Sequence, residues 1–247
     1  MFVSTLTRRM LSYGVATFVL SLQPLTSQAA LSISGTRVVI ESDQRSVSII
    51  VRNPSKKTYA AQAWVNTEAD DTTTAVPLIA SPPLFRLDPG KDQQVQINAL
   101  PNTLPSDRES LFYFNVQEIP QTNDTSGNAL NIAIRTRIKL FYRPHTLEGG
   151  SVAKLAELQW FLSEVNGVSQ LIVRNPTPYH VSFVRLDVMA NGKKHLVKNP
   201  DMSAPLSERA FELEGLKYQE GMQVVFSAIN DYGAYTQPLT LPIQAAR

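Results

Sequence analysis

The sequence predicts an all-β protein built from two β-sandwich domains. Three observations lead to this class. Beyond residue 30, short apolar or alternating runs are separated by Pro, Gly, Asn and Asp, without an apolar stripe of helical length. The strand pattern stops between Pro144 and Ser151, a stretch with two glycines, and then resumes. A five-residue motif of the first half recurs in the second, as expected for two related domains.

The first 29 residues have the composition of a secretory signal peptide. Arg8 and Arg9 form a basic start, residues 10–22 are largely apolar, and small residues precede a cleavage position after Ala29. The apolar run is too short for a comfortable membrane span, and no later stretch reaches about eighteen uninterrupted apolar residues. We therefore expect export through the general secretion route and a soluble mature protein.

The mature chain is close to neutral, so its charge gives no reason to expect nucleic-acid binding. The full sequence has 23 Lys and Arg against 21 Asp and Glu, and the signal peptide holds two arginines and no acid, which leaves 21 of each sign. The sequence has neither a basic tail nor a Gly-rich phosphate loop. It also has no cysteine, so stability in an oxidising compartment must come from apolar cores rather than disulfides.

We place the first domain at residues 30–148. Turn signals such as Asn53-Pro54 and Asp88-Pro89-Gly90 separate its strand-like runs. The predicted strands include Arg37–Ile40, Ser46–Val51, Ala60–Val65, Gln94–Ile97 and Leu111–Val116.

The longest predicted strand runs from Asn128 to Pro144. One face carries Leu130, Ile132, Ile134, Ile138 and Leu140, and the other carries Asn131, Arg135, Arg137 and Lys139. Pro144 ends the strand because proline cannot donate a ladder hydrogen bond. Strands usually have about five or six residues, so part of this one is expected to extend beyond its sheet and to require a partner.

The second domain is placed at residues 149–247. Its predicted strands include Gln170–Val173, Val181–Val188 and Gln223–Ala228. The repeated motif is Ile-Val-Arg-Asn-Pro, which begins at Ile50 and again at Ile172, an offset of 122 residues. In both places an apolar strand runs into Asn-Pro, which suggests that each domain uses the same strand and turn.

The sequence lacks the usual patterns of an enzyme. His145, His180 and His195 are scattered without metal-ligand spacing, and there is neither a Gly-x-Ser-x-Gly motif nor a cysteine nucleophile. We therefore expect no catalytic residue, no cofactor and no metal site, and we look for function in binding.

Several longer motifs resemble the periplasmic pilus-assembly chaperones of the chaperone-usher pathway, the PapD-like family. The resemblance covers nearly all of the first domain and is weaker in the second. The matching segments are Thr36–Val38, Tyr59–Trp64, Pro83–Gly90, Asp107–Asn115, Glu118–Pro120, Ile138–Pro144, Asn175-Pro176 and Asn230–Gly233. The short connection between Pro120 and Ala129 is similar to the subfamily associated with rod-like pili.

The resemblance implies two immunoglobulin-like domains set at an angle with a cleft between them. In this family the chaperone lends a strand to a pilin subunit that lacks its own final strand. Matched residue by residue, Leu130, Ile132 and Ile134 would be the donated side chains. Arg37 and Lys139 would bind the carboxylate at the subunit's C-terminus by charge-assisted hydrogen bonds.

The resemblance also implies a charged trio that joins the two domains, formed by Glu109, Arg143 and Asp231. From local pattern alone these residues could equally be a solvated ion pair and a turn residue. Strict alternation places Lys139 and Ile134 on opposite faces, so a bulge or a strong twist is expected if both contact one ligand.

We therefore expect a periplasmic chaperone that binds pilin subunits and delivers them to an outer-membrane usher. The sequence leaves open whether the free protein self-associates. The alternative is a secreted two-domain sandwich that binds carbohydrate or cell surfaces.

Overall fold

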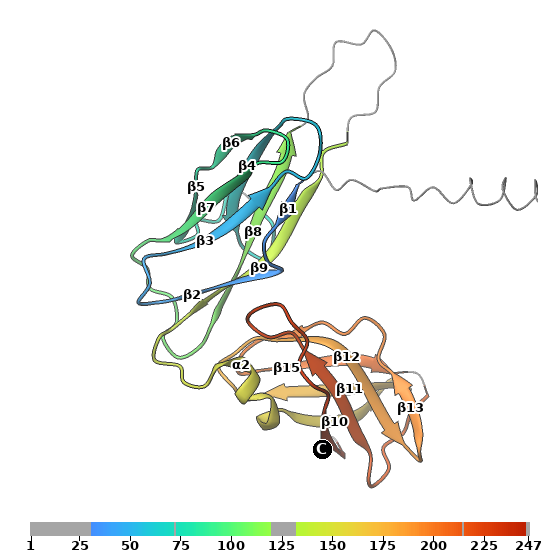
Figure 1. Cartoon of the computed structure of the whole chain (residues 1–247). Helices are drawn as coiled ribbons and strands as arrows, with labels where there is room; N and C mark the ends of the chain where they lie inside the picture. The colour runs from blue at the N-terminus through green and yellow to red at the C-terminus, as the bar shows by residue number, and fades with distance from the viewer. Residues whose placement is uncertain (1–30, 72, 120–131, 214, 246–247) are drawn as a thin grey trace, which may run out of the picture.

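The computed structural model describes residues 31–71, 73–119, 132–213 and 215–245, and shows two β-sandwich domains (Figure 1). The predicted signal peptide, the connection before the long strand and Leu130 lie outside the described residues. The strands of the two domains run in different directions, and the ends of β2 (Arg37–Glu41) and β9 (Arg135–Arg143) approach the second domain (Figure 1). Within the described residues, no helix is long and apolar enough to cross a bilayer.

The first domain packs a four-stranded sheet, in the order β1-β3-β7-β5, against a five-stranded sheet, in the order β2-β9-β8-β4-β6. Alternate strand residues point into the shared core, including Ile40, Val95, Phe114 and Leu140. The remaining strands are β1 (Ser32–Ile33), β3 (Ser46–Arg52), β4 (Tyr59–Asn66), β5 (Leu78–Ser81), β6 (Leu84–Leu87), β7 (Asp92–Ala99) and β8 (Ser110–Ile119).

The chain changes sheets immediately after its first strand. β1 pairs with β3 in one sheet, whereas β2 pairs in parallel with β9 in the other. The register of this parallel pair sets Arg37 opposite Lys139 and Glu41 opposite Arg143. Two predicted cations that are far apart in sequence therefore become neighbours.

Of the long strand predicted from Asn128 to Pro144, residues 128–131 lie outside the described residues, and residues 132–134 are not part of a strand. β9 begins at Arg135, and its antiparallel register with β8 is continuous from Gln117–Arg135 to Ser110–Tyr142. This register contains no bulge, and Ile134 precedes the strand, so the expectation of a bulge or a strong twist stays a prediction. The ladder stops there because the N–H of Ile134 donates to a side-chain oxygen of Glu118 instead of to the main chain.

The second domain begins with a four-residue helix, α2 (Gly150–Ala153), and a short 3-10 turn at Leu155–Glu157. A parallel contact between β10 and β17 joins its two halves into one sheet, in the order β13-β12-β16-β17-β10-β11-β15, with β14 beside β12. The strands are β10 (Gln159–Val165), β11 (Val168–Asn175), β12 (Val181–Ala190), β13 (Lys193–Leu196), β14 (Met202–Ser203), β15 (Ser207–Leu213), β16 (Gln223–Ala228) and β17 (Leu239–Ala245).

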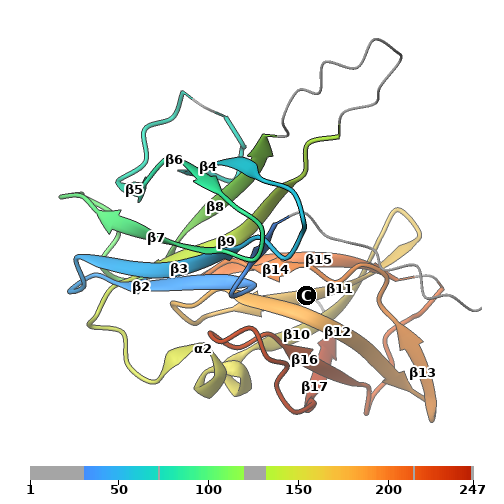
Figure 2. The ribbon, with the colours of Figure 1, turned by 45° about the horizontal axis from the view of Figure 1, so that its top comes forward.

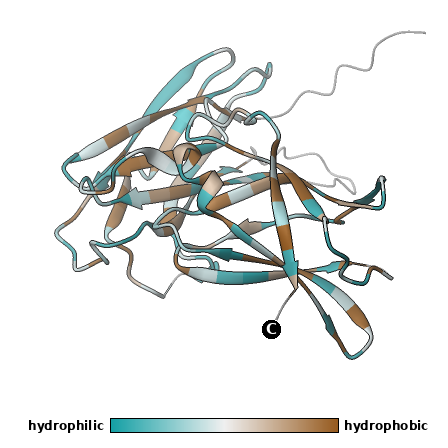
Figure 3. Cartoon of the chain, turned by 90° about the horizontal axis from the view of Figure 1, so that it is seen from below, coloured by the Kyte–Doolittle hydropathy of each residue, from teal (hydrophilic) through white to brown (hydrophobic). Residues whose placement is uncertain are grey.

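An aromatic cluster fills the second core. Trp160 lies against Phe183 and Phe226, with ring centroids 5.4 and 5.3 Å apart. Hydrophobic and hydrophilic residues alternate along the strands, so each sheet has one apolar face (Figure 3). The apolar cores thus supply stability without cysteine.

The repeated Asn-Pro motif has the same structure in both domains. The side-chain amide of Asn53 donates to the carbonyls of Lys57 and Leu87, and that of Asn175 donates to the carbonyls of Tyr179 and Ala204. Each asparagine also accepts hydrogen bonds from the main chain and hydroxyl of the residue two positions later. Both asparagines are fully buried, so each closes a turn at the end of a strand.

We predict that Asn175→Ala lowers the free energy of unfolding by roughly 2–3 kcal/mol, because it removes all four hydrogen bonds of a fully buried side-chain amide. Urea denaturation followed by tryptophan fluorescence would measure the change. Thr103→Ala, at an exposed loop position, is the control and should change stability by less than about 0.5 kcal/mol. Equal stability of the two variants would contradict this role for the motif.

Candidate functional site

A buried ion-pair junction joins the two domains around Arg143. Arg143 is only 6% exposed at the end of β9. Its Nε donates to Glu109 Oε1 at 2.8 Å, and its terminal nitrogens donate to the two carboxylate oxygens of Asp231 at 2.8 and 3.0 Å. Glu109 belongs to the first domain and Asp231 to the loop between β16 and β17. The structure thus brings the three predicted residues into direct contact.

Glu109 also bonds to the second domain directly. Its Oε2 accepts a hydrogen bond from the main-chain N–H of His180 at 2.8 Å and lies 3.1 Å from His180 Nδ1. Its own N–H donates to the carbonyl of Pro178 at 2.9 Å. Sequence reasoning missed His180, which it treated only as one of three scattered histidines.

The contact between Arg143 and Asp231 favours the charged form of both side chains. Burial alone would lower the pKa of Arg143, but its hydrogen bonds to Asp231 and the charges of Asp231 and Glu109 outweigh burial and raise it. Burial alone would raise the pKa of Asp231, but the hydrogen bonds and charge of Arg143 leave it below its usual range. Ser151 adds a hydroxyl 3.3 Å from Asp231 Oδ1.

Arg37 and Lys139 lie side by side next to this junction. Arg37 donates from one terminal nitrogen to the carbonyl of Ile229 at 3.1 Å, and Lys139 Nζ is 3.4 Å from the hydroxyl of Ser182. Both contacts cross to the second domain. Arg37 also lies over the ring of Phe141, with its guanidinium carbon 5.7 Å from the ring centroid.

Arg37 and Lys139 have fewer hydrogen-bond and ion-pair partners in the described part of the chain than their charged groups can accommodate. Arg37 Nε is buried without a hydrogen-bond partner among the described residues, and neither cation forms a salt bridge with a described carboxylate. Burial lowers the pKa of both Arg37 and Lys139. Nearby carboxylates, chiefly Asp231 for Arg37 and Asp201 for Lys139, offset this only in part. The pair therefore has the chemistry of an anion site with unused donors.

The edge of β9 beside these cations is open. β2 pairs with β9 only from Lys139 to Arg143, and no described strand covers the same edge between Arg135 and Ile138. Just before this edge, Ile132 and Ile134 are 64% and 50% exposed. Leu130, the third predicted donor residue, is outside the described residues. An open strand edge flanked by exposed apolar side chains is suited to the addition of a further strand.

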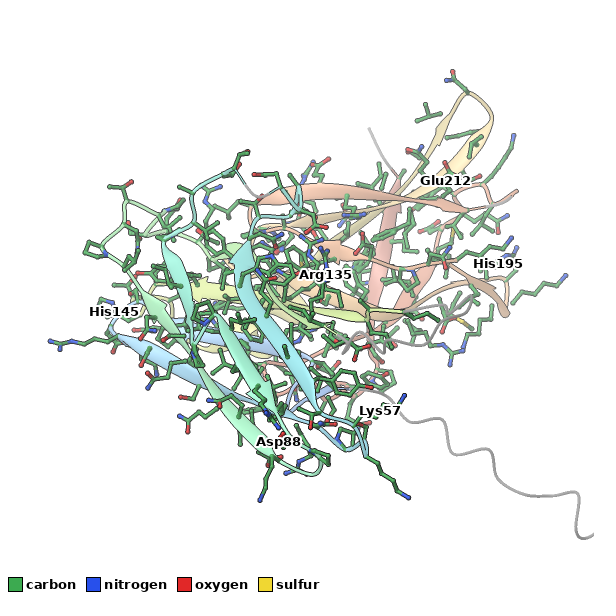
Figure 4. The ribbon with its side chains drawn as sticks, turned by 90° about the horizontal axis from the view of Figure 1, so that it is seen from above. Lys57, Asp88, Arg135, His145, His195 and Glu212 are labelled. Atoms are coloured by element: carbon green, nitrogen blue, oxygen red, sulfur yellow. The ribbon has the colours of Figure 1, made fainter. Side chains whose placement is uncertain are left out.

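The histidines do not form a common site. His145 and His195 lie on opposite sides of the molecule (Figure 4), whereas His180 is held by Glu109. Within the described ranges, no group of three or more His, Cys, Asp or Glu residues could hold a metal ion.

The cation pair, the open strand edge and the two sandwiches form a surface suited to binding another polypeptide. Two family descriptions match the chain: pili and flagellar-assembly chaperone, PapD N-terminal domain, over residues 30–148, and pili assembly chaperone PapD, C-terminal domain, over residues 153–239. The chain belongs to the PapD-like pilus-assembly chaperone family of the chaperone-usher pathway. It is a periplasmic chaperone and not an enzyme.

Individual relatives agree with this assignment. The probable fimbrial chaperone YadV of Escherichia coli is 40% identical over 217 residues, which cover 84% of this chain and 88% of that protein. The chaperone protein FimB/FhaD of Bordetella pertussis is 40% identical over 240 residues, covering 94% of this chain and 93% of the relative.

Solved structures show the same fold. The crystal structure of YadV has a TM-score of 0.74 at 38% identity and covers 86% of this chain and 100% of its own. The SafB chaperone of Salmonella enterica, solved in complex with the SafA pilin, shares the fold with a TM-score of 0.74 at 24% identity, covering 87% of this chain and 97% of its own. The family assignment gives no support to the carbohydrate-binding alternative.

We predict that Arg143→Ala lowers the free energy of unfolding by about 3–5 kcal/mol, because it leaves the buried carboxylate of Glu109 without its cation. Asp231→Asn should cost only about 1 kcal/mol, because Asp231 is partly exposed and asparagine keeps one acceptor. Urea denaturation of both variants would measure the difference. A loss no larger for Arg143→Ala than for Asp231→Asn would contradict the central position of Arg143.

Proposed function

We propose that this chaperone captures pilin subunits in the cleft between its domains and passes them to an outer-membrane usher. The observation that carries the proposal is the register of β2 and β9. It sets Arg37 beside Lys139 at the point where the edge of β9 becomes open. A polypeptide strand could therefore pair with the open edge while its terminal carboxylate lies against the two cations.

Each part of the site has a separate task in this proposal. Arg37 and Lys139 hold the C-terminal carboxylate of the subunit and so fix the register of the added strand. Ile132 and Ile134, together with Leu130, fill the groove that a pilin lacking its last strand leaves open. Each isoleucine buried in this way contributes roughly 1.5–3 kcal/mol before the cost of ordering. SafB, which shares the fold, forms a complex with a pilin.

The trio of Glu109, Arg143 and Asp231 has an indirect task. It holds the second domain against the first, so that Ser182 and the carbonyl of Ile229 orient the two cations. No nucleotide is required, because subunit folding and the later exchange of strands supply the free energy.

We predict that Lys139→Ala and Arg37→Ala each abolish recovery of a pilin subunit while the chaperone stays folded, because half of the carboxylate site is removed. Periplasmic co-purification of tagged chaperone with candidate subunits would measure recovery. Lys57→Ala, which removes an exposed cation elsewhere on the first domain, is the control and should retain wild-type recovery. Unimpaired capture by both cleft variants would refute the anchor.

We predict that Ile132→Asp weakens subunit binding by roughly tenfold or more, because a carboxylate replaces an apolar side chain in the subunit's groove. The anchor is unchanged, so recovery falls without being abolished. Ile79→Asp, at a similarly exposed isoleucine on β5, is the matched control. If Ile132→Asp bound subunits as tightly as this control, the donor-strand assignment would be wrong.

A further inference from the structure

Glu118 is a buried carboxylate that has no place in the site described above. It lies one residue before the end of β8 and is 3% exposed. It alternates with Phe112, Phe114 and Val116, so its side chain points to the core face of the sheet. It makes no salt bridge with any described residue, and its Oε2 has no hydrogen-bond partner among them.

Both hydrogen bonds of Glu118 at this end of the sheet go to Ile134. The main-chain N–H of Glu118 donates to the carbonyl of Ile134 at 3.1 Å, and Glu118 Oε1 accepts from the N–H of Ile134 at 3.0 Å. In a regular antiparallel pair that N–H would donate to the main-chain carbonyl of Glu118. The carboxylate takes its place, and the chain before β9 then parts from β8 (Figure 2).

The contact between Glu118 and Ile134 also determines which main-chain N–H and C=O groups face the open edge of β9. Successive residues of an extended chain direct their main-chain groups to opposite edges. Because Ile134 directs both of its groups to Glu118, the main-chain groups of Arg135, the first residue of β9, are directed to the open edge. The contact thus orients the main chain that an added strand would pair with, directly beside the exposed side chains of Ile132 and Ile134.

Stability of the first domain does not explain a glutamate here. A buried carboxylate without a cation is costly, and burial raises the pKa of Glu118, although the N–H of Ile134 partly offsets this. An apolar side chain of the same size would avoid the cost. The presence of Glu118 is better explained by its hydrogen bond to Ile134, which holds the main chain just before β9.

We propose that Glu118 is a positioning residue that fixes the main chain of Ile134 and so presents Ile132, Ile134 and the open edge of β9 to an incoming pilin strand. This inference rests on the proposed function for the identity of the incoming strand. The contact between Glu118 and Ile134 itself is independent of that function.

The test compares Glu118→Met, which keeps the size of the side chain, with Glu118→Gln, which keeps an oxygen acceptor. Amide hydrogen exchange by NMR on the free, full mature chain would follow Ile134, with Phe114 as a core reference. In Glu118→Met we expect exchange at Ile134 to accelerate roughly tenfold or more, with Phe114 unchanged. Subunit capture should weaken by a similar factor while the melting temperature stays the same or rises. Glu118→Gln should behave as wild type.

Two results would overturn the proposal. In the first, the amide of Ile134 stays protected in Glu118→Met and in a second apolar variant, Glu118→Leu. In the second, exchange accelerates but capture is unchanged, so the contact does not present the strand. If the proposed function itself were wrong, wild type and Glu118→Gln would both capture no pilin, which distinguishes this outcome from the other two. The exchange at Ile134 would still decide whether Glu118 holds it.

Discussion

The buried ion-pair junction at Arg143 is the interaction on which the arrangement of the two domains depends. Its side chain is almost completely removed from water, and its charge is balanced by Glu109 from one domain and Asp231 from the other. A domain arrangement that satisfied Arg143 only in part would leave a charge buried without a partner, at a cost of several kcal/mol. The junction therefore favours one arrangement, which also brings the main chain of His180 to the second oxygen of Glu109.

β9 connects this junction to the binding site, because alternate residues of a strand share a face. Lys139, Phe141 and Arg143 face the second domain, while Ile138 and Leu140 are buried in the first. In our proposal the cation acts on the face of β9 that lies toward the second domain, and the added strand pairs along the open edge. The donated side chains Ile132 and Ile134 lie in the segment just before β9. One ligand can therefore contact all three parts of the site.

The sequence predicted what depends on local pattern. The two sandwiches, the main strands and the repeated asparagine turn were all visible as alternation or as a motif. The prediction that Arg37 and Lys139 share a site came from family resemblance. No local sequence pattern predicts a parallel pairing between two segments that are far apart in the chain. Glu118 was missed because a charged residue in an alternating strand is normally solvated. Its partner is a main-chain N–H, which carries no signal in the sequence, and the same contact explains why β9 begins later than predicted.

In our proposal, Arg37 and Lys139 together bind the terminal carboxylate of a pilin subunit. The most direct measurement is a double-mutant cycle with a peptide of a subunit's C-terminal strand, prepared with a free carboxylate and as the C-terminal amide. Titration calorimetry against wild type and the Arg37→Ala, Lys139→Ala double variant gives four affinities. We predict that amidation weakens binding to wild type by roughly tenfold or more and has little effect on the variant. An equal effect of amidation on both proteins, or none on wild type, would contradict it.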